Sequence, residues 1–311
     1  MPNVTIDDFA RSFGTTPSEF SNVCLENINK HDFSYKLLAK KSRDGVILEV
    51  LKKISGDTQI IGAKERTAAW ENGWAENLEA FKASNFDLDT LVPKFIRANQ
   101  PIRYNGDYII PRNSRFEYDY MTVFRIWLFQ KYFSDYSTIY EFGCGSGLNL
   151  VLLASLMPDK KLFGLDFVQS SVELMNRIGQ THNWPLSGCH FDMIKPDESF
   201  RLSKGSAVLT FGALEQVAGK FESFIQYLLK QKIGICVHVE PTIELYDETK
   251  LFDYLAVQFH RKRGYTENLL PYIQRLETEK KVKILQIKRL YFGSLFMEGY
   301  TYFVWQPLSG E

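Results

Sequence analysis

The spacing of apolar residues changes character along the chain. Up to residue 110 the apolar positions recur mainly every three or four residues, a spacing that predicts helices. The strongest example covers residues 64–84, where one apolar stripe runs along an otherwise charged segment. The stripe consists of Trp70, Trp74, Leu78 and Phe81. We expect it to pack against the rest of the protein, and the alternative is a face that covers a substrate or binds a partner.

From residue 138 onward, short apolar runs alternate with amphipathic segments. Five of the runs are predicted strands, with helices between them: 138–142, 161–166, 188–191, 207–211 and 233–240. Two longer alternating runs, 282–292 and 299–306, follow and meet around Gly293. This order predicts an α/β fold: a doubly wound, mostly parallel seven-stranded sheet with an antiparallel C-terminal hairpin, preceded by a helical extension.

The predicted division of the chain lies at residue 110. Residues 1–110 form the helical N-terminal extension, which we expect to act as a lid, and residues 111–311 form the catalytic domain. Asn105-Gly106 is a turn signal within residues 101–111, so a small hairpin is expected just before the boundary. Residues 91–98 suggest a further short helix.

A glycine-rich turn follows the first predicted strand of the domain. Glycine stands at 143, 145 and 147, and an apolar helix is predicted over 147–157. A strand, a glycine turn and a helix bring a row of backbone N–H groups to a helix N-terminus and leave room for a ligand. The second strand ends in Asp166, where an acid is placed to bind the two hydroxyls of a ribose.

The glycine spacing separates two families of nucleotide-binding folds. The dinucleotide pattern G-x-G-x-x-G does not fit, because the third glycine comes one residue early. Glu141 precedes the turn, and the resulting E-x-G-x-G-x-G resembles motif I of the class I S-adenosylmethionine (SAM) dependent methyltransferases. The resemblance implies that SAM is the cofactor. It places Glu141 near the SAM amino group, the loop around the methionine part and Asp166 on the ribose; the loop comprises Gly143, Cys144, Gly145 and Gly147.

The resemblance covers residues 100–311 and extends to further candidate cofactor contacts. It implies that Asp192 accepts a hydrogen bond from the adenine amino group, with Asp192 as a plain turn residue the alternative. The other implied contacts are Phe167, Met193, Phe211 and Glu215, and Arg103 could pair with the SAM carboxylate. Gln216 stands where small-molecule methyltransferases often have a histidine base, so this chain needs a base from elsewhere.

The fifth predicted strand supplies candidates for that base. His238 and Glu240 are two residues apart, which places both on one face of a strand at its ligand end. A histidine beside an acid can share a proton and act as a general base. A structural hydrogen-bonded pair is the alternative. His260 is the second candidate, and no metal site is predicted because no fourth ligand is visible.

Composition limits the classes of partner. Lysine plus arginine and aspartate plus glutamate each number 37 in 311 residues, so the net charge is zero, which argues against a nucleic acid or a membrane surface as the partner. The four cysteines have no disulfide or metal spacing, and the first residues do not resemble a signal peptide, so a cytoplasmic protein is expected. Arg261, Lys262 and Arg263 are either a solvated helix end or a site for an acidic group.

Together these patterns predict SAM-dependent methyl transfer to a small polar metabolite. Residues 238–247 resemble a branch of bacterial methyltransferases that act on sugars or other small polar metabolites, which implies a sugar, and the basic run at 261–263 suits an acidic group. A hydroxyl acceptor is preferred to an amine because His238 and Glu240 are expected to act together as a general base. The alternatives are an RNA or protein methyltransferase, a non-catalytic SAM-binding subunit and a nicotinamide enzyme. The oligomeric state stays open.

Overall fold

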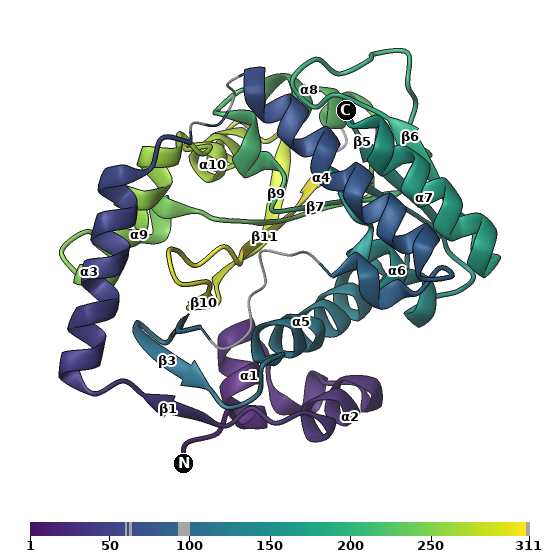
Figure 1. Ribbon diagram of the computed structural model, residues 1–311. Coiled ribbons are helices and arrows are strands. Elements are labelled where there is room, and N and C mark those ends of the chain that lie inside the picture. Colours follow the sequence, from purple (N-terminus) through teal and green to yellow (C-terminus); the bar gives the residue numbers. More distant parts are fainter. Residues whose placement is uncertain (60, 62–63, 93–99, 309–311) are drawn as a thin grey trace.

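The computed structural model describes residues 1–59, 61, 64–92 and 100–308. Its centre is a seven-stranded sheet in the order β6-β5-β4-β7-β8-β11-β9 (Figure 1). The first five strands in this order are parallel, and β11 runs antiparallel to both β8 and β9. The strands are β4 (Thr138–Phe142), β5 (Lys161–Asp166), β6 (Leu186–His190), β7 (Ala207–Phe211), β8 (Ile235–Glu240), β9 (Val282–Arg289) and β11 (Thr301–Pro307). The predicted α/β fold is confirmed.

Helices cover both faces of this sheet, which explains why its inner strands are buried along nearly their whole length. All five residues of β4 are buried. Ile139 packs in one core with α5, α6 and α7, and its neighbour Tyr140 points into a second core with α8 and α10. The helices are α5 (Phe116–Phe133), α6 (Leu148–Leu156), α7 (Gln169–His182), α8 (Glu222–Lys230), α9 (Leu251–Arg263) and α10 (Leu269–Thr278). Four short 3-10 helices are η1 (Pro17–Glu19), η2 (Leu88–Leu91), η3 (Leu214–Val217) and η4 (Ile243–Leu245).

A second, antiparallel sheet has the order β1-β3-β2-β10. Its strands are β1 (Tyr35–Leu37), β2 (Ile102–Tyr104), β3 (Asp107–Pro111) and β10 (Phe292–Gly293). The hairpin expected at Asn105-Gly106 is present, since β2 pairs with β3 and both turn residues have positive φ. The expected C-terminal hairpin is present, because β9 pairs antiparallel with β11, but its first strand does not extend through residue 292 to a turn at Gly293. β9 ends at Arg289, and Phe292 pairs with Tyr104 in the second sheet because its ring stacks on Tyr120, 3.8 Å away.

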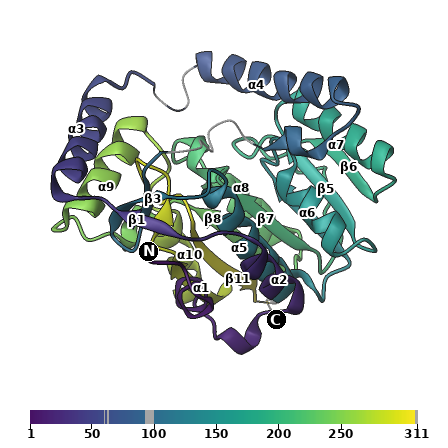
Figure 2. The same cartoon turned by 60° about the horizontal axis from the view of Figure 1, so that its bottom comes forward.

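The first part of the chain is helical, as expected, apart from these short strands. Its helices are α1 (Ile6–Phe13), α2 (Asn22–Lys30), α3 (Lys40–Gly56) and α4 (Lys64–Ala83). Figures 1 and 2 show α3 beside α9 and α4 beside α7. Phe9 and Phe13 pack on aromatic rings of α5 and share one core with the main sheet. The boundary at residue 110 therefore stays a prediction. Most of the short helix expected over residues 91–98 falls outside the described residues.

Candidate functional site

The glycine turn lies at the carboxyl end of β4, next to the end of β5. Gly143, Gly145 and Gly147 have φ values of 73°, 53° and 76°. The backbone N–H groups of Gly143 and Cys144 donate to the carbonyl of Leu165 (2.7 and 3.2 Å), which ties the turn to β5. A Cβ on Gly143 would lie 2.4 Å from that of Ala213, so both the conformation and the space require glycine here. Gly147 then caps the N-terminus of α6.

Asp166, at the end of β5, holds this turn in place. Its Oδ2 accepts from Gly145 N and its Oδ1 from Val168 N, each at 3.0 Å. The hydroxyl of Ser171 donates to the same carboxylate at 3.3 Å. Asp166 is buried, and burial raises the pKa of its carboxyl despite these bonds. The acid expected to bind a ribose thus also positions the loop beside it.

Two residues expected to contact the adenosine part lie near the turn. The Met193 methyl carbon would be 3.4 Å from a Cβ on Gly143. Phe167 is 41% exposed, which leaves its ring free for stacking. Asp192 accepts a hydrogen bond from Ile194 N at 2.8 Å, the contact of a turn residue.

Glu141 is buried directly before the glycine turn, and its carboxyl is only partly satisfied. Its Oε1 accepts from the Asn149 amide at 2.6 Å, whereas its Oε2 has no hydrogen-bond partner in the described part of the chain. Asn149 is held in turn by the Nε of Arg125 at 2.7 Å. Burial raises the pKa of Glu141 to about 8. A buried carboxyl oxygen without a partner is a place where a cation or a hydrogen-bond donor of a ligand can bind.

Arg125 links Glu141 to a second buried acid that the sequence did not suggest. Its Cζ lies 4.9 Å from the ring centre of Phe211, at the end of β7. Glu117, in the first turn of α5, accepts from the hydroxyl of Tyr300 at 3.5 Å, and its Oε2 has no partner among the described residues. Burial raises the pKa of Glu117 to about 7. Charged residues on the buried side of an aromatic-rich helix were the available signal.

Arg103 lies away from this cluster, in the second sheet. Its guanidinium donates to the carbonyl of Phe252 on α9 and lies 3.9 Å from the carboxylate of Glu298. Glu298 also binds Arg289, which pairs with Asp253. These contacts form a buried ionic network between the second sheet and α9. Arg125 is bonded to Asn149, the partner of Glu141, whereas the role expected of Arg103 at a SAM carboxylate stays a prediction.

His238 lies inside the sheet. It is fully buried, with its Nδ1 2.8 Å from the Thr210 hydroxyl and its Nε2 3.3 Å from the Cys236 sulfur. The ring of Phe303 packs against it at 4.9 Å. Burial lowers the pKa of His238 to about 3, which keeps the ring neutral at pH 7. These are the contacts of a core residue.

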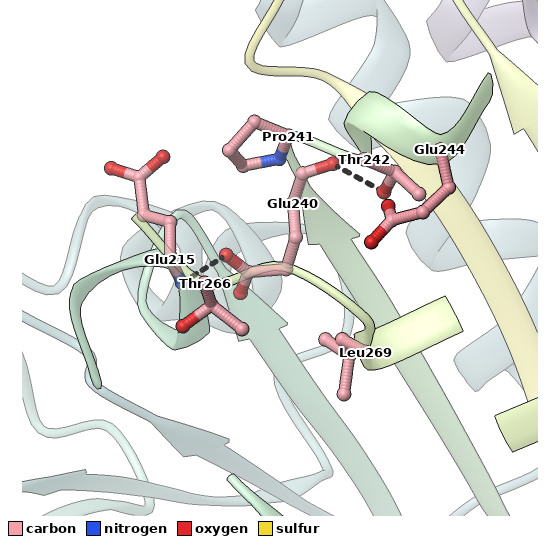
Figure 3. A pocket seen from close by; sticks show the side chains of 7 residues that line it. All are labelled: Glu215, Glu240, Pro241, Thr242, Glu244, Thr266 and Leu269. Atoms are coloured by element: carbon pink, nitrogen blue, oxygen red, sulfur yellow. Dashed lines mark hydrogen bonds between the residues drawn. The ribbon is translucent and has the colours of Figure 1, made fainter. Parts of the chain in front are cut away.

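Glu240 ends β8 and holds the loop that follows β7. Its carboxylate accepts from the backbone N–H groups of Ala213, Leu214 and Glu215, each at 3.1 Å. Figure 3 shows the carboxylate directed at the Glu215 nitrogen, while the Glu215 side chain points away. A small pocket lies beside them, lined also by Pro241, Thr242, Glu244, Thr266 and Leu269. Burial raises the pKa of Glu240 to about 7.

His260 and the basic run after it also have partners. The Nε2 of His260 is 2.9 Å from the carbonyl of Thr266, and burial lowers its pKa to about 4. Arg261 pairs with Glu248 at 3.1 Å, and Arg263 pairs with Asp57 at 2.6 Å. These contacts favour structural roles for this segment.

The apolar stripe of α4 reaches the glycine turn. Leu78 and Phe81 are buried, and Trp70 and Trp74 stack with ring centres 5.7 Å apart. A Cβ on Gly145 would lie 2.7 Å from the Trp74 ring, so this indole covers the turn. Glu71 holds α4 in place by accepting from Ser170 N, at the start of α7, at 3.2 Å.

Comparison with known proteins gives structural matches only. No family model matches the chain, and no curated protein does. A branched-chain polyamine synthase from Thermus thermophilus, solved with N4-aminopropylspermidine and 5′-methylthioadenosine, matches at 13% identity and a TM-score of 0.43. The match covers 61% of this chain and 56% of that one, about half of its length.

Two further structures match a similar share of this chain. The methyltransferase domain of bacterial CtHen1-C matches at 16% identity and a TM-score of 0.43, over 61% of this chain and 97% of that domain. An O-methyltransferase from neocarzinostatin biosynthesis, solved with SAM and 2-hydroxy-5-methyl naphthoic acid, matches at 11% identity and a TM-score of 0.40, over 61% and 57%.

Neither a metal site nor a membrane-spanning helix is found in the described part of the chain. Among residues 1–59, 61, 64–92 and 100–308, no three His, Cys, Asp or Glu side chains gather where they could hold a metal ion. No helix in the same ranges combines the length and the apolar content needed to cross a bilayer.

Proposed function

We propose that this protein transfers the methyl group of SAM to a hydroxyl or an amine of a small polar metabolite. The proposal depends on one observation. Glu141, beside the glycine turn at the end of the central strand, is a buried acid, and one of its carboxyl oxygens has no hydrogen-bond partner among the described residues. Its setting supports the same function, because ligands of open α/β sheets bind at the carboxyl ends of the parallel strands.

The residues around Glu141 suit the amino-acid end of the donor. Glu141 can accept from an ammonium group, and Arg125 can pair with a carboxylate. The glycines of the turn have no Cβ that would block a ligand at the backbone once Trp74 moves aside, and Asp166 keeps that turn in shape. The exposed ring of Phe167 and the Met193 side chain beside Gly143 support the expectation that both contact an adenine ring. When bound, SAM supplies a methyl group that its sulfonium already makes electrophilic.

The acceptor then has to be held in line with the methyl group, and it has to lose a proton. Phe211 ends β7, the neighbour of β4, and the loop fixed by Glu240 follows it, so we expect the acceptor to approach there. His238, Glu240 and His260 are the sequence-based candidates for the base. The hydrogen bonds of all three within the protein favour positioning roles for them.

Calorimetry with S-adenosylhomocysteine (SAH), the product of the donor, and with NAD tests the proposal. We expect SAH to bind with a micromolar Kd and NAD not to bind. Binding of NAD without binding of SAH would contradict the proposal. Transfer of label from methyl-labelled SAM to a metabolite extract would then separate an enzyme from a non-catalytic SAM-binding subunit.

A further inference from the structure

Glu117 is a buried acid that the donor site described above does not use. It is 5% exposed, its Oε1 accepts only a long bond of 3.5 Å from the Tyr300 hydroxyl, and its Oε2 has no partner among the described residues. A side chain in this state is costly to bury unless something binds it. It therefore points to a ligand group that is absent from the free protein.

Glu117 lies next to the proposed donor site. Arg125 acts electrostatically on both Glu117 and Glu141, and it contacts Phe211 at the end of β7. The Tyr300 ring is 6.1 Å from the ring of Phe211. A group bound between Glu117 and Tyr300 thus lies at the same edge of the sheet as the donor, where an acceptor has to be.

The charges around Tyr300 favour a positive group. Glu117, Glu141 and Glu215 are three acids that act on this region, and among the described residues Arg125 is the cation that acts on both Glu117 and Tyr300. A donor that carries one ammonium and one carboxylate matches Glu141 and Arg125 and leaves Glu117 without a counter-charge. In the free protein burial relieves this excess by favouring the protonated form of Glu117.

The walls of this region are aromatic. The ring centre of Tyr300 lies 6.1 Å from that of Phe211 and 6.1 Å from that of Phe292. Aromatic faces attract cations through the ring quadrupole, as the Phe211 ring already does with the Arg125 guanidinium 4.9 Å from its centre. A buried carboxyl together with aromatic faces suits an amine better than a sugar, whose hydroxyls require both donors and acceptors.

We propose that Glu117 and Tyr300 form the acceptor site and that the acceptor is an amine; this rests on the proposed methyltransferase function. Glu117 takes a proton from the bound ammonium and so frees the nitrogen lone pair. The nitrogen bonds to the methyl carbon while the carbon–sulfur bond breaks and its electron pair stays on sulfur. The methylated ammonium product leaves, and Glu117 releases its proton to water.

The test uses benzylamine and its near-isosteric alcohol, benzyl alcohol, as probes on the protein saturated with SAH. We expect wild-type protein to bind benzylamine about tenfold more tightly than benzyl alcohol, since a charged hydrogen bond contributes at least this much. Glu117→Gln should abolish the preference and leave SAH affinity unchanged. Glu222→Gln, which removes an exposed acid on α8, should preserve the preference.

The outcomes separate this inference from the proposed function. If wild-type protein does not bind SAH, the proposed function fails. If SAH binds but benzylamine is not preferred, or the preference survives Glu117→Gln, the amine site is overturned. A loss of SAH affinity in Glu117→Gln would assign this acid to the donor and also overturn it. Should Glu117→Gln not fold, Tyr300→Phe is expected to reduce the preference about threefold, and no reduction would contradict the proposal.

Discussion

Two strands of the main sheet have a buried glutamate at their carboxyl end: Glu141 is the second-to-last residue of β4, and Glu240 is the last residue of β8. Burial raises the pKa of both, to about 8 and about 7. They differ in their partners. Glu240 accepts hydrogen bonds from three backbone N–H groups. Glu141 accepts one from the Asn149 side chain, and its second oxygen has no partner among the described residues. The same residue at the same end of a strand can thus serve the loop or a ligand. Which of the two roles the glutamate has depends on whether backbone N–H groups already donate hydrogen bonds to its carboxylate oxygens.

Among variants of these two acids, the largest effect is expected on the stability of a Glu240 variant. In Glu240→Ala the N–H groups of Ala213, Leu214 and Glu215 lose their acceptor in a buried place, at a cost of about 3 kcal/mol in the free energy of unfolding. Urea unfolding at pH 7 measures it. Glu141→Gln is the matched control and should not lower the stability, because a glutamine can still accept from Asn149. Equal stability of Glu240→Ala and wild-type protein would contradict the role given to Glu240.

The affinity for SAH should depend more on Glu141 than on Glu240. Glu141→Gln removes a carboxyl that the donor ammonium would hold in its ionised form, and it is expected to weaken SAH binding by about 10- to 100-fold. Glu240→Gln should change the same Kd by less than about threefold, since its carboxylate faces the backbone. Calorimetry on the two variants provides the comparison. A larger loss in Glu240→Gln than in Glu141→Gln would remove Glu141 from the donor site.

The pH dependence of stability separates the two acids further. The folded-state pKa of Glu141 lies near 8, above its ordinary value of 4.5, so the folded protein holds a proton that the unfolded chain has lost. The stability gained from that proton is present at low pH and is lost as the pH rises toward 8. Between pH 7 and 8 wild-type protein should lose up to about 1 kcal/mol more than Glu141→Gln.

Glu240 is expected to contribute less than Glu141 in that interval, because its pKa lies near 7 and about half of its carboxyls are already ionised at pH 7. Glu240→Gln should therefore keep most of the wild-type slope between pH 7 and 8. Unfolding curves at several pH values test this. A wild-type slope that persists in Glu141→Gln and vanishes in Glu240→Gln would contradict the assignment of the two pKa values.

The smallest effect is expected at Trp74, which covers the glycine turn from α4. Removing the indole in Trp74→Ala should speed SAH association a few-fold, because the ring has to move before a ligand reaches Gly145. Stopped-flow fluorescence measures the rate. Trp184→Phe, which changes a tryptophan stacked on His182, is the control and should not alter it. An unchanged rate in Trp74→Ala would show that the ring does not restrict entry.

Much of the main sheet could be predicted from the sequence, because its strands and helices have distinct apolar periods. β4, β5 and β7 have the predicted bounds, and the glycine turn follows β4 as expected. The C-terminal hairpin was only partly foreseen. An alternating pattern continues through Phe292, but that residue is recruited by the ring of Tyr120, a contact that no local pattern reveals.

The candidate site was less predictable, because the sequence does not show where a buried side chain finds its partners. His238 and Glu240 share a strand face, as expected, yet Thr210 and the loop after β7 occupy them. Arg103 is near the boundary of the domain in sequence but is bound by residues of the second sheet and α9. Arg125 and Glu117 were hidden in an aromatic-rich helix, and only the packing of α5 against the sheet brings them to Glu141.

The most direct test of the donor site is a crystal structure of the protein with SAH. We predict that the amino group of SAH lies within hydrogen-bonding distance of Glu141 Oε2, with its carboxylate at Arg125 and its sulfur over the glycine turn. A structure with SAH bound elsewhere, for example beside Glu240, and with Glu141 Oε2 still unpartnered would contradict the account.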